Sequence, residues 1–495
     1  MTYAALPAHQ GKKMTDKATY PAYDRTRLTA GIVHIGVGNF HRAHQAVYLD
    51  DLFALGGDHD WAILGAGVRA GDARMRDALA AQDYLSTVIE LEPGHPSARV
   101  IGAMTGFVPV QANNAALIAA MGDPAIRIVS LTVTEGGYYI DAATAAFDAS
   151  HADIVADAAN PAQPGTAFGA MIAALKQRHA AGIAPFTVMS CDNLPGNGHV
   201  TRAAVLGLAR LSDPAFADWI AANVAFPNGM VDRITPATGP HERALAAQFG
   251  LDDPVPVTCE PFRQWVLEDN FPAGRPALER VGVTFTKDVH GYEAMKIRML
   301  NGGHAIIAYP SALMDLTLVH QAMADPLIHA FLAKLERDEI IPHVAPVPGA
   351  SPAEYLDLIM GRFANPDIAD TTARLCLDGS NRQPKFILPS LRDTLAAGGT
   401  GDGLLLLSAF WCRYCAGHTD SGVAIAPNDP DWDALQACAK AAKSDPAKWL
   451  GMTHIYGDLG QNNVVVARFG AHLKAIWAQG TRAVLQRFLR FCWFG

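Results

Sequence analysis

A short segment of the 495-residue chain gathers side chains that could move a proton. It reads Glu293-Ala-Met-Lys296-Ile-Arg-Met-Leu-Asn301-Gly-Gly-His304. On an α-helix, at about 100° per residue, the four numbered side chains fall within roughly 140° of arc. The two glycines would leave room beside this face for a ligand or another backbone. A solvated polar face with a hydrogen-bonded histidine is the alternative interpretation of this pattern.

Lys296 offers the chemistry of a general acid and base. Oxidation of a secondary alcohol removes the hydroxyl proton while a hydride leaves the carbon, so a base or a metal ion must act there. A desolvated lysine can have its pKa lowered toward neutrality, and it can then accept the proton and return it. The chain shows no plausible set of zinc ligands, so an amino-acid base is expected. The side-chain amides of Asn301 and of Asn193, in SCDNLPGNG, could hold a developing alkoxide.

A glycine turn near the start of the chain offers a site for an anion. In AGIVHIGVGNFHRAHQAVYLDDL, a β-branched run precedes Gly36 and Gly38, and apolar residues at helical spacing follow them. Backbone N–H groups at the start of such a helix favour a pyrophosphate. His41 replaces the third glycine of the usual motif, so a tight turn without a ligand stays an alternative. The residues expected to bind a dinucleotide here are Ile35, Gly36, Val37, Gly38, Asn39, Phe40, His41 and Arg42, with His44 a further residue of this loop rather than a catalytic one.

The loop RAGDAR, which follows the predicted strand WAILGAGV, bears on the type of dinucleotide. Asp72 could bind the ribose hydroxyls of NAD, whereas Arg69 could accept the 2′-phosphate of NADP. We expect NAD, and NADP stays open as the alternative.

The elements that must position these groups change in kind along the chain. Apolar strands alternate with helical stretches at 166–179 and 200–211, which indicates a mainly parallel sheet with helices on both faces. After about residue 288 the pattern is mostly helical. We therefore predict an α/β domain over residues 1–288 and a largely helical domain over 289–495. The predicted strands after the first lie at 61–68, 99–104, 127–134 and 185–191.

Composition and charge argue against several classes of protein. The net charge of −9 disfavours a nucleic-acid partner, which would need a basic face. No apolar stretch is long enough to span a bilayer, so no membrane association is expected. The first thirty residues are polar, with Lys12, Lys13 and Lys17, and lack the apolar segment of a signal peptide. We expect a cytoplasmic protein.

The seven cysteines favour the same compartment, because an odd number scattered over a long chain is not typical of a disulfide framework. Cys412 and Cys415 form a CxxC within the apolar run LLLLSAFWCRYC. This run predicts a buried helix, and a metal or redox role for the pair is the weaker alternative.

Several segments resemble the mannitol 2-dehydrogenase family, the polyol-specific long-chain dehydrogenases. They are GIVHIGVGNFHRAHQA, SLTVTEGGYY, SCDNLPGNG, FPNGMVDRITP, EPFRQWVLEDNF and KIRMLNGGHA. They follow in order from about Pro21 to past Lys385, and KxRxLNxxH with the modified glycine turn is highly specific to this group. The resemblance implies a Rossmann-type N-terminal domain, a mostly α-helical C-terminal domain that carries substrate-binding and catalytic residues, an active site between them and metal-free catalysis. Asn39 departs from the pattern, since many relatives have glycine there.

The resemblance also implies roles for individual residues. Lys296 matches the general acid/base, and Asn193 with Asn301 matches an oxyanion pocket that contacts substrate. His304 matches a hydrogen-bond partner of the substrate oxygen. Glu293 matches a residue that gates a proton path from the lysine to solvent.

Further matches concern the cofactor and the far end of the substrate. Glu135, in VTEGGYY, matches a residue near the nicotinamide. Val231 matches a residue beside the cofactor, and Asp232 one beside the substrate. The polyol-binding end corresponds to Arg374, Arg382 and Lys385, for which a solvated surface cluster is the alternative.

The expected activity is therefore NAD-dependent oxidation of a sugar alcohol, D-mannitol to D-fructose, by a monomeric enzyme. D-arabinitol and sorbitol are alternatives that the sequence does not separate from mannitol. Hexuronate reductases and mannitol-1-phosphate dehydrogenases of the same fold need a cationic clamp, which Arg374, Arg382 and Lys385 could form. A non-enzymatic NAD-binding regulator is disfavoured, because it would be expected to lose one of the four residues Lys296, Asn193, Asn301 and His304.

Overall fold

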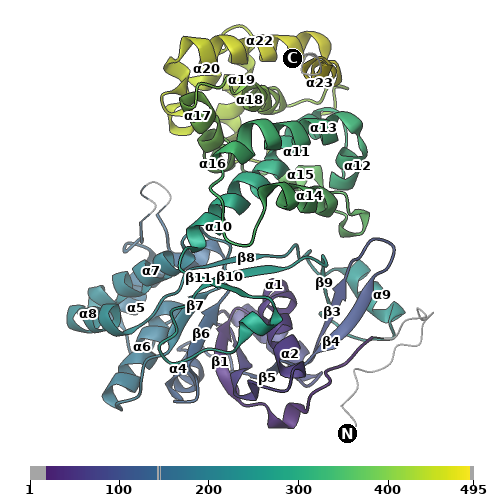
Figure 1. Cartoon of the computed structure of the whole chain (residues 1–495). Helices are drawn as coiled ribbons and strands as arrows, with labels where there is room; N and C mark the ends of the chain where they lie inside the picture. Colours follow the sequence, from purple (N-terminus) through teal and green to yellow (C-terminus); the bar gives the residue numbers. More distant parts are fainter. Residues whose placement is uncertain (1–17, 142–143, 145, 491–495) are drawn as a thin grey trace. The chain divides into compact units, whose positions relative to one another are not determined.

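The computed structural model describes residues 18–141, 144 and 146–490 (Figure 1). Lys12, Lys13, Lys17 and Cys492 lie outside the described residues. The chain forms two compact units, Met1–His290 and Gly291–Gly495, each of which has its own architecture. The predicted fold class, a Rossmann-type α/β domain and a mostly helical domain, is confirmed.

The first unit is built on a five-stranded parallel sheet with the order β5-β2-β1-β6-β7. The chain runs from β1 through β2 to β5 on one side, then returns to the other side of β1 for β6 and β7. The carboxyl ends of β1 and β6 therefore flank the point where the strand order reverses, which is where sheets of this kind bind ligands. The strands are β1 (Ala30–Ile35), β2 (Ala62–Ala66), β5 (Met104–Phe107), β6 (Ile128–Leu131) and β7 (Thr187–Ser190).

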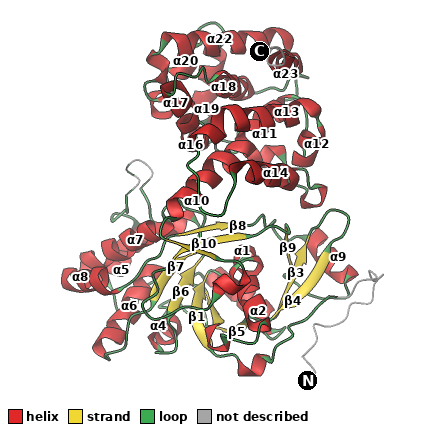
Figure 2. Cartoon of the chain, viewed as in Figure 1, coloured by secondary structure: helices red, strands yellow, loops and turns green. Residues whose placement is uncertain are grey.

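Alternating side chains of these strands fill two separate cores, one on each face of the sheet. Val33 and Leu131 belong to the core that includes helices α4, α6, α7 and α8, whereas Ile32 and Met189 belong to the core that includes α2. Figure 2 shows the helices around the strands of this unit. The helices are α1 (Asn39–Ala43), α2 (Gln45–Ala54), α3 (Ala73–Ala80), α4 (Ala115–Gly122), α5 (Ala152–Ala159), α6 (Ala167–Ala180), α7 (Asn197–Ser212), α8 (Pro214–Asn223) and α9 (Pro240–Gln248), with 3-10 turns at Arg25–Arg27, His59–Trp61, Ala70–Asp72, Glu135–Tyr138 and Leu278–Val281.

Two smaller sheets complete the unit. In one, β8 (Gly229–Asp232) pairs antiparallel with β10 (Gln264–Glu268), and β11 (Thr284–Thr286) pairs parallel with β10. The other has the order β4-β3-β9, with bounds β3 (Ser86–Glu90), β4 (Ser97–Ile101) and β9 (Val257–Cys259).

One predicted strand is wrong. Residues 99–104 do not form a single strand, because β4 ends at Ile101 in the small sheet and β5 begins at Met104 in the main sheet. The break falls at Gly102, whose N–H donates to Asp50 Oδ1 (2.8 Å) instead of to a neighbouring strand. The Arg25 side chain lies where a Cβ of Gly102 would be.

All regular elements described after Thr286 are helical. The longest apolar run becomes α18 (Asp402–Cys415), which contacts α11 and α22. Cys412 and Cys415 are 0% and 1% exposed, so the prediction of a buried helix is confirmed. None of the described helices is both long and apolar enough to cross a membrane. The other elements are α10 (Val289–Met295), the π-helix η6 (Lys296–Asn301), α11 (Gly302–Leu313), α12 (Val319–Ala324), α13 (Pro326–Leu335), the π-helix η7 (Glu336–Ile340), η8 (Ile341–His343), α14 (Pro352–Phe363), η9 (Pro366–Ile368), α15 (Thr372–Leu375), α16 (Gly379–Phe386), α17 (Leu388–Ala396), α19 (Trp432–Ala442), α20 (Ala447–Leu450), α21 (Thr453–Tyr456), η10 (Leu459–Gln461), α22 (Asn463–Gln479) and α23 (Thr481–Arg490).

Candidate active site

The glycine turn after β1 is held by the strands on both sides of it. Gly36 has a φ of +96°, and a Cβ added there would lie 2.1 Å from the carbonyl oxygen of Thr132. Its N–H donates to Ala66 O (2.9 Å), and its carbonyl accepts from Thr132 Oγ1 (2.6 Å). Only glycine fits this position, because both the backbone angle and the space exclude a side chain.

Gly38, just before α1, differs from Gly36 in the space that surrounds it. The nearest atom to a Cβ built on Gly38 is Gly36 O, at 4.0 Å. The missing side chain therefore leaves open space beside the first N–H groups of α1. An open backbone surface between a strand and a helix fits the close approach of a dinucleotide pyrophosphate.

The side chains of Asn39 and Arg42 are engaged by the protein itself. Asn39 Nδ2 donates to Pro236 O (3.0 Å) and Thr238 Oγ1 (2.9 Å), while its Oδ1 accepts from Arg42 Nη2 (2.8 Å). Arg42 is 0% exposed and also donates to Val255 O. These bonds leave the backbone, rather than the two side chains, as the surface that α1 offers to a ligand.

The histidines of the turn are part of the interior. His41 is 1% exposed, and its ring stacks on His34 with 3.5 Å between centroids. His34 is fixed in turn by Ser130 Oγ (2.8 Å), and His44 Nε2 lies 2.9 Å from Gln264 O. Burial lowers the pKa of His34 and of His44 to about 3 and that of His41 well below its usual value. The three rings are therefore neutral at physiological pH.

Arg69 and Asp72 lie just beyond the carboxyl end of β2, where a ribose-binding acid is expected. The Asp72 carboxylate accepts a hydrogen bond from the backbone N–H of Arg69 (2.9 Å). It packs against Gly67, where a Cβ would lie 2.3 Å from Asp72 Cβ. The Arg69 side chain is exposed. The loop thus holds the Asp72 carboxylate in place and leaves the Arg69 guanidinium in solvent.

Glu135 and Asn193 follow neighbouring parallel strands, β6 and β7, at the same edge of the sheet. Both are exposed. Asn197, which sequence reasoning missed, is fully buried a short way along the same segment as Asn193. Its side chain donates to Gly229 O (2.8 Å) and accepts from Gly229 N (2.9 Å), which joins the start of α7 to the start of β8.

Strand β8 carries Val231 and Asp232, which are 2% and 7% exposed. The next residue, Arg233, was also missed by sequence reasoning. Its guanidinium donates to Ala43 O (2.6 Å), Glu90 Oε1 (2.6 Å) and Glu260 O (3.0 Å). Arg233 therefore fixes the end of β8 against α1, β3 and the residue after β9.

The lysine–asparagine segment of the second unit is not a regular α-helix. Residues 296–301 form the π-helix η6, in which Gly302 N–H donates to Ile297 O, five residues earlier. Such a bond inserts one extra residue into a helical turn. The side-chain arc predicted for a regular α-helix therefore does not hold across η6. Arg298 braces the turn through His343 O (3.1 Å) and Asp393 Oδ2 (2.6 Å). Turns of this kind are rare and are frequent at functional sites.

The predicted catalytic groups of this segment are mostly buried. Lys296 is 5% exposed and Glu293 is 6% exposed. The ring of His304 stacks on Phe363 with 4.2 Å between centroids. Asn301 is half-buried at the end of η6.

The room beside the two glycines of the segment is taken by the protein. A Cβ on Gly302 would lie 3.5 Å from Phe386 O, and one on Gly303 would lie 3.3 Å from both Glu336 Oε1 and Phe363 Cε2. Both glycines therefore allow close packing of neighbouring elements behind η6.

Glu336, which sequence reasoning missed, begins the second π-helix, η7, which contacts η6. It is 0% exposed, and neither carboxyl oxygen has a hydrogen-bond partner within the described part of the chain. Burial raises the pKa of Glu336 well above its usual value. Burial without a partner therefore favours the protonated form of the Glu336 carboxyl group.

The three cations expected at the polyol-binding end are not equivalent. Arg374 forms two hydrogen bonds with Asp370, which raise the pKa of the guanidinium and balance its charge. Arg382 donates to Leu375 O (3.3 Å), and Lys385 is exposed. Arg374 is thus not an unpaired cation of the kind that an anion clamp requires.

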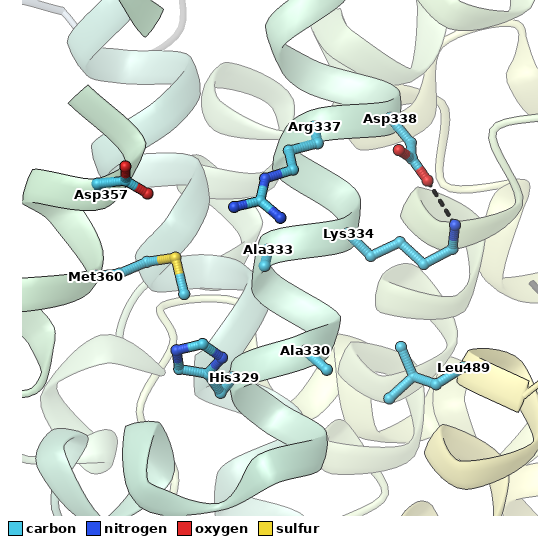
Figure 3. Close-up of a pocket in the computed structure, with 9 residues that line it drawn as sticks. All are labelled: His329, Ala330, Ala333, Lys334, Arg337, Asp338, Asp357, Met360 and Leu489. Atoms are coloured by element: carbon cyan, nitrogen blue, oxygen red, sulfur yellow. Dashed lines mark hydrogen bonds and ion pairs between the residues drawn. The ribbon is translucent and has the colours of Figure 1, made fainter. Parts of the chain in front are cut away.

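The helical unit also has a pocket beside α13 and η7 (Figure 3). Lys334 and Asp338 form an ion pair on its wall, and none of the predicted site residues lines it. In the described segments, no three His, Cys, Asp or Glu side chains gather so as to hold a metal ion. The lining residues are His329, Ala330, Ala333, Lys334, Arg337, Asp338, Asp357, Met360 and Leu489.

These features define a two-part protein with a dinucleotide-type α/β unit and a helical unit. Residues 30–280 match the model of the mannitol dehydrogenase Rossmann domain, and residues 288–477 match that of the mannitol dehydrogenase C-terminal domain. The chain belongs to the mannitol dehydrogenase family, and the predicted resemblance is confirmed.

Relatives cover nearly the whole chain. It is 72% identical over 476 residues to a mannitol 2-dehydrogenase of Cereibacter sphaeroides, covering 96% of this chain and 100% of the relative. A ternary complex of Pseudomonas fluorescens mannitol 2-dehydrogenase with NAD and D-mannitol is 42% identical, with a TM-score of 0.82 over 96% of this chain and 97% of that one. A substrate-free D-sorbitol dehydrogenase is 35% identical, with a TM-score of 0.89 over 97% and 100%.

The buried acid Glu336 predicts a specific pH dependence of stability. A carboxyl whose pKa is raised by folding keeps its proton in the native state and loses it in the unfolded state above about pH 4.3. Its contribution to stability therefore falls by about 1.4 kcal/mol per pH unit above that value, until the folded pKa is reached. Glu336→Gln removes this slope. We expect the variant to gain stability relative to the wild type as the pH rises above about 5 in urea denaturation.

The matched control is Glu354→Gln, because Glu354 is exposed on a helix of the same unit. Its stability is measured against the wild type over the same pH range, as the reference for removal of an exposed carboxyl group. A difference that does not change with pH for Glu336→Gln would show that Glu336 is ionised in the folded protein.

Proposed function

We propose that the protein is an NAD-dependent polyol dehydrogenase that oxidises D-mannitol to D-fructose. The observation that carries this proposal is the buried Lys296 in a π-helix, within a chain that matches the mannitol dehydrogenase family over both units. The relatives support the substrate, since the Pseudomonas fluorescens structure is described as a complex with NAD and D-mannitol.

The glycine turn is proposed to hold the dinucleotide. The open space at Gly38 and the first N–H groups of α1 would receive the pyrophosphate, and Asp72 would accept hydrogen bonds from ribose hydroxyls. Bound NAD would supply the hydride acceptor. NAD is favoured because the carboxylate of Asp72 is fixed in its loop, while the exposed Arg69 keeps NADP as the alternative.

Lys296 is proposed to act as general base in oxidation and as general acid in reduction. Burial favours the neutral amine, which is the form that accepts the hydroxyl proton. Asn193 and Asn301 would donate hydrogen bonds to the developing alkoxide, and His304 would bind the same oxygen. Glu293, buried one turn before the lysine, would pass the proton toward solvent. No metal ion takes part in this proposed mechanism.

The polyol is proposed to be uncharged. Asp370 balances the charge of Arg374, which supports binding of hydroxyl groups over binding of a phosphate or carboxylate. Arg382, Lys385 and Asp232 would contact the remaining hydroxyls. Sorbitol and D-arabinitol remain alternatives.

We also propose that the enzyme acts as a monomer in the cytoplasm. The free, buried thiols of five cysteines support the cytoplasmic location, because thiols stay reduced in that compartment.

The direct test is a substrate panel followed by absorbance of reduced nicotinamide. The panel holds mannitol, arabinitol, sorbitol, mannitol 1-phosphate and a hexuronate-derived alditol, with NAD⁺ or NADP⁺, and with or without a chelator. We expect NADH formation that is fastest with mannitol and insensitive to the chelator. Turnover of charged substrates alone, or loss of activity with the chelator, would contradict the proposal.

Lys296→Ala is expected to lower kcat by about 10⁴-fold, because general acid–base catalysis contributes up to that factor. The NAD dissociation constant, measured by fluorescence titration, should stay unchanged. The pH profile of the wild type should show one ionisation that the variant lacks. Lys287→Ala is the matched control, since Lys287 is exposed nine positions earlier. Near-normal turnover in Lys296→Ala would rule out the lysine as the base.

The two glycines of the turn give a paired prediction about the cofactor. Gly38→Ala places a methyl group in open space, so the fold should be intact while the NAD dissociation constant rises about tenfold or more. Gly36→Ala instead clashes with Thr132 and should lower the free energy of unfolding by about 2 kcal/mol or more. Thermal unfolding and NADH fluorescence titration separate the two effects. Unchanged NAD binding in Gly38→Ala would place the pyrophosphate elsewhere.

A further inference from the structure

The carboxylate of Asp192 joins two loops at the carboxyl edge of the main sheet. Asp192 lies two residues after the end of β7, and its Oδ2 accepts from Val133 N (2.8 Å) and from the hydroxyl of Tyr138 (2.7 Å). Its Oδ1 accepts from Thr134 N (3.1 Å). All three donors belong to the segment that follows β6, so one side chain fixes this segment to the segment after β7.

The segment held by Asp192 contains a strained residue. Thr134 has φ +62° and ψ +169°, a backbone region that is populated essentially by glycine. A β-branched residue persists there only when its surroundings enforce the conformation. The hydrogen bonds of Asp192 to the amides of Val133 and Thr134 are contacts of this kind.

Burial, a neighbouring charge and hydrogen bonds act together on the Asp192 carboxyl group. Burial raises the pKa of Asp192, and the charge of Glu135 raises it further. The three hydrogen bonds from Tyr138, Val133 and Thr134 act in the opposite direction by favouring the carboxylate. These donors therefore favour the carboxylate form of Asp192, whose two oxygens accept from all three of them and so clamp the segment after β6.

We propose that Asp192 is a positioning residue for hydride transfer. It fixes the backbone at Thr134, and so places Glu135 on one loop and Asn193, its own neighbour, on the other. This inference rests on the proposed function, in which Glu135 lies near the nicotinamide and Asn193 holds the alkoxide. Asp192 itself touches neither substrate nor cofactor in this role.

The test compares two variants of the full chain. Asp192→Asn replaces one acceptor oxygen by an amino group, so it cannot accept from all three donors. Tyr138→Phe is the matched control, because it removes the phenol and keeps both backbone amides on the carboxylate. The readouts are kcat and KM for mannitol, the NAD dissociation constant, and hydrogen exchange of amides 133 and 134 in the ligand-free protein.

Asp192→Asn should lower kcat about 100-fold, the effect of misplacing reacting groups by about 1 Å. The KM for mannitol and the NAD dissociation constant should stay within about threefold, and exchange at amides 133 and 134 should accelerate. Tyr138→Phe should retain kcat within about fivefold. Adding Thr134→Gly to Asp192→Asn should restore thermal stability without restoring kcat, since glycine adopts this backbone freely.

Three results would overturn the proposal. Unchanged exchange at amides 133 and 134 in Asp192→Asn would show that the clamp does not hold the loop, whatever the activity. A kcat within threefold of the wild type would show that the clamp is irrelevant to turnover. Equal losses of kcat in both variants, together with equal losses of melting temperature, would make Asp192 a residue of general stability. If the wild type oxidises no polyol, the proposed function fails. Hydrogen exchange at amides 133 and 134 then still tests whether Asp192 holds the loop.

Discussion

The close approach of β1 and β6 is the constraint on which the first unit depends. At the end of β1 the chain must turn within reach of Thr132, whose carbonyl occupies the place where a side chain on Gly36 would be. The turn then leaves Gly38 beside open space. The strand order reverses between the same two strands, so this close approach lies at the edge of the sheet where ligands usually bind.

Buried and partly buried polar side chains connect this turn to the neighbouring elements. Asn39 and Arg42 join α1 to the segments at 236–238 and 255, and Asn197 joins α7 to β8. Arg233 then fixes the end of β8 to α1. A buried donor or acceptor is costly when it is unpaired, so each of these contacts specifies the position of a loop as well as adding stability.

Much of this fold could be predicted from local sequence, because period and turn chemistry are local signals. The strand before Gly36, the helices at 166–179 and 200–211 and the change to helices near residue 288 follow from them. The roles of the two glycines could not, since the contact between Gly36 and Thr132 spans almost a hundred residues. For the same reason the buried stacking of His41 on His34 is invisible in a motif that suggests ligand binding.

The second unit shows a different limit of sequence reasoning. An α-helical period places Lys296, Asn301 and His304 on one arc, but one inserted residue in η6 changes that relation. Glu336 lies in the charged run ERDEI, which is typical of a solvated helix face, yet it is fully buried in η7. Pattern rules assume a regular helix, and a π-turn breaks that assumption without leaving a clear signal in composition.

Three departures from low-energy structure involve or adjoin residues with proposed roles in catalysis. Thr134 adopts a backbone region that suits glycine, Lys296 lies in a π-turn, and Glu336 is buried with no hydrogen-bond partner among the described residues. Thr134 precedes Glu135, and Lys296 is itself proposed to act in catalysis. Glu336 begins η7, which contacts η6. Mutations that relieve such costs are common, so a chain under selection for stability alone would be expected to lose them. Retention of such costs is what a functional constraint produces, because strain and unsatisfied polar groups are kept where the chemistry requires a particular geometry.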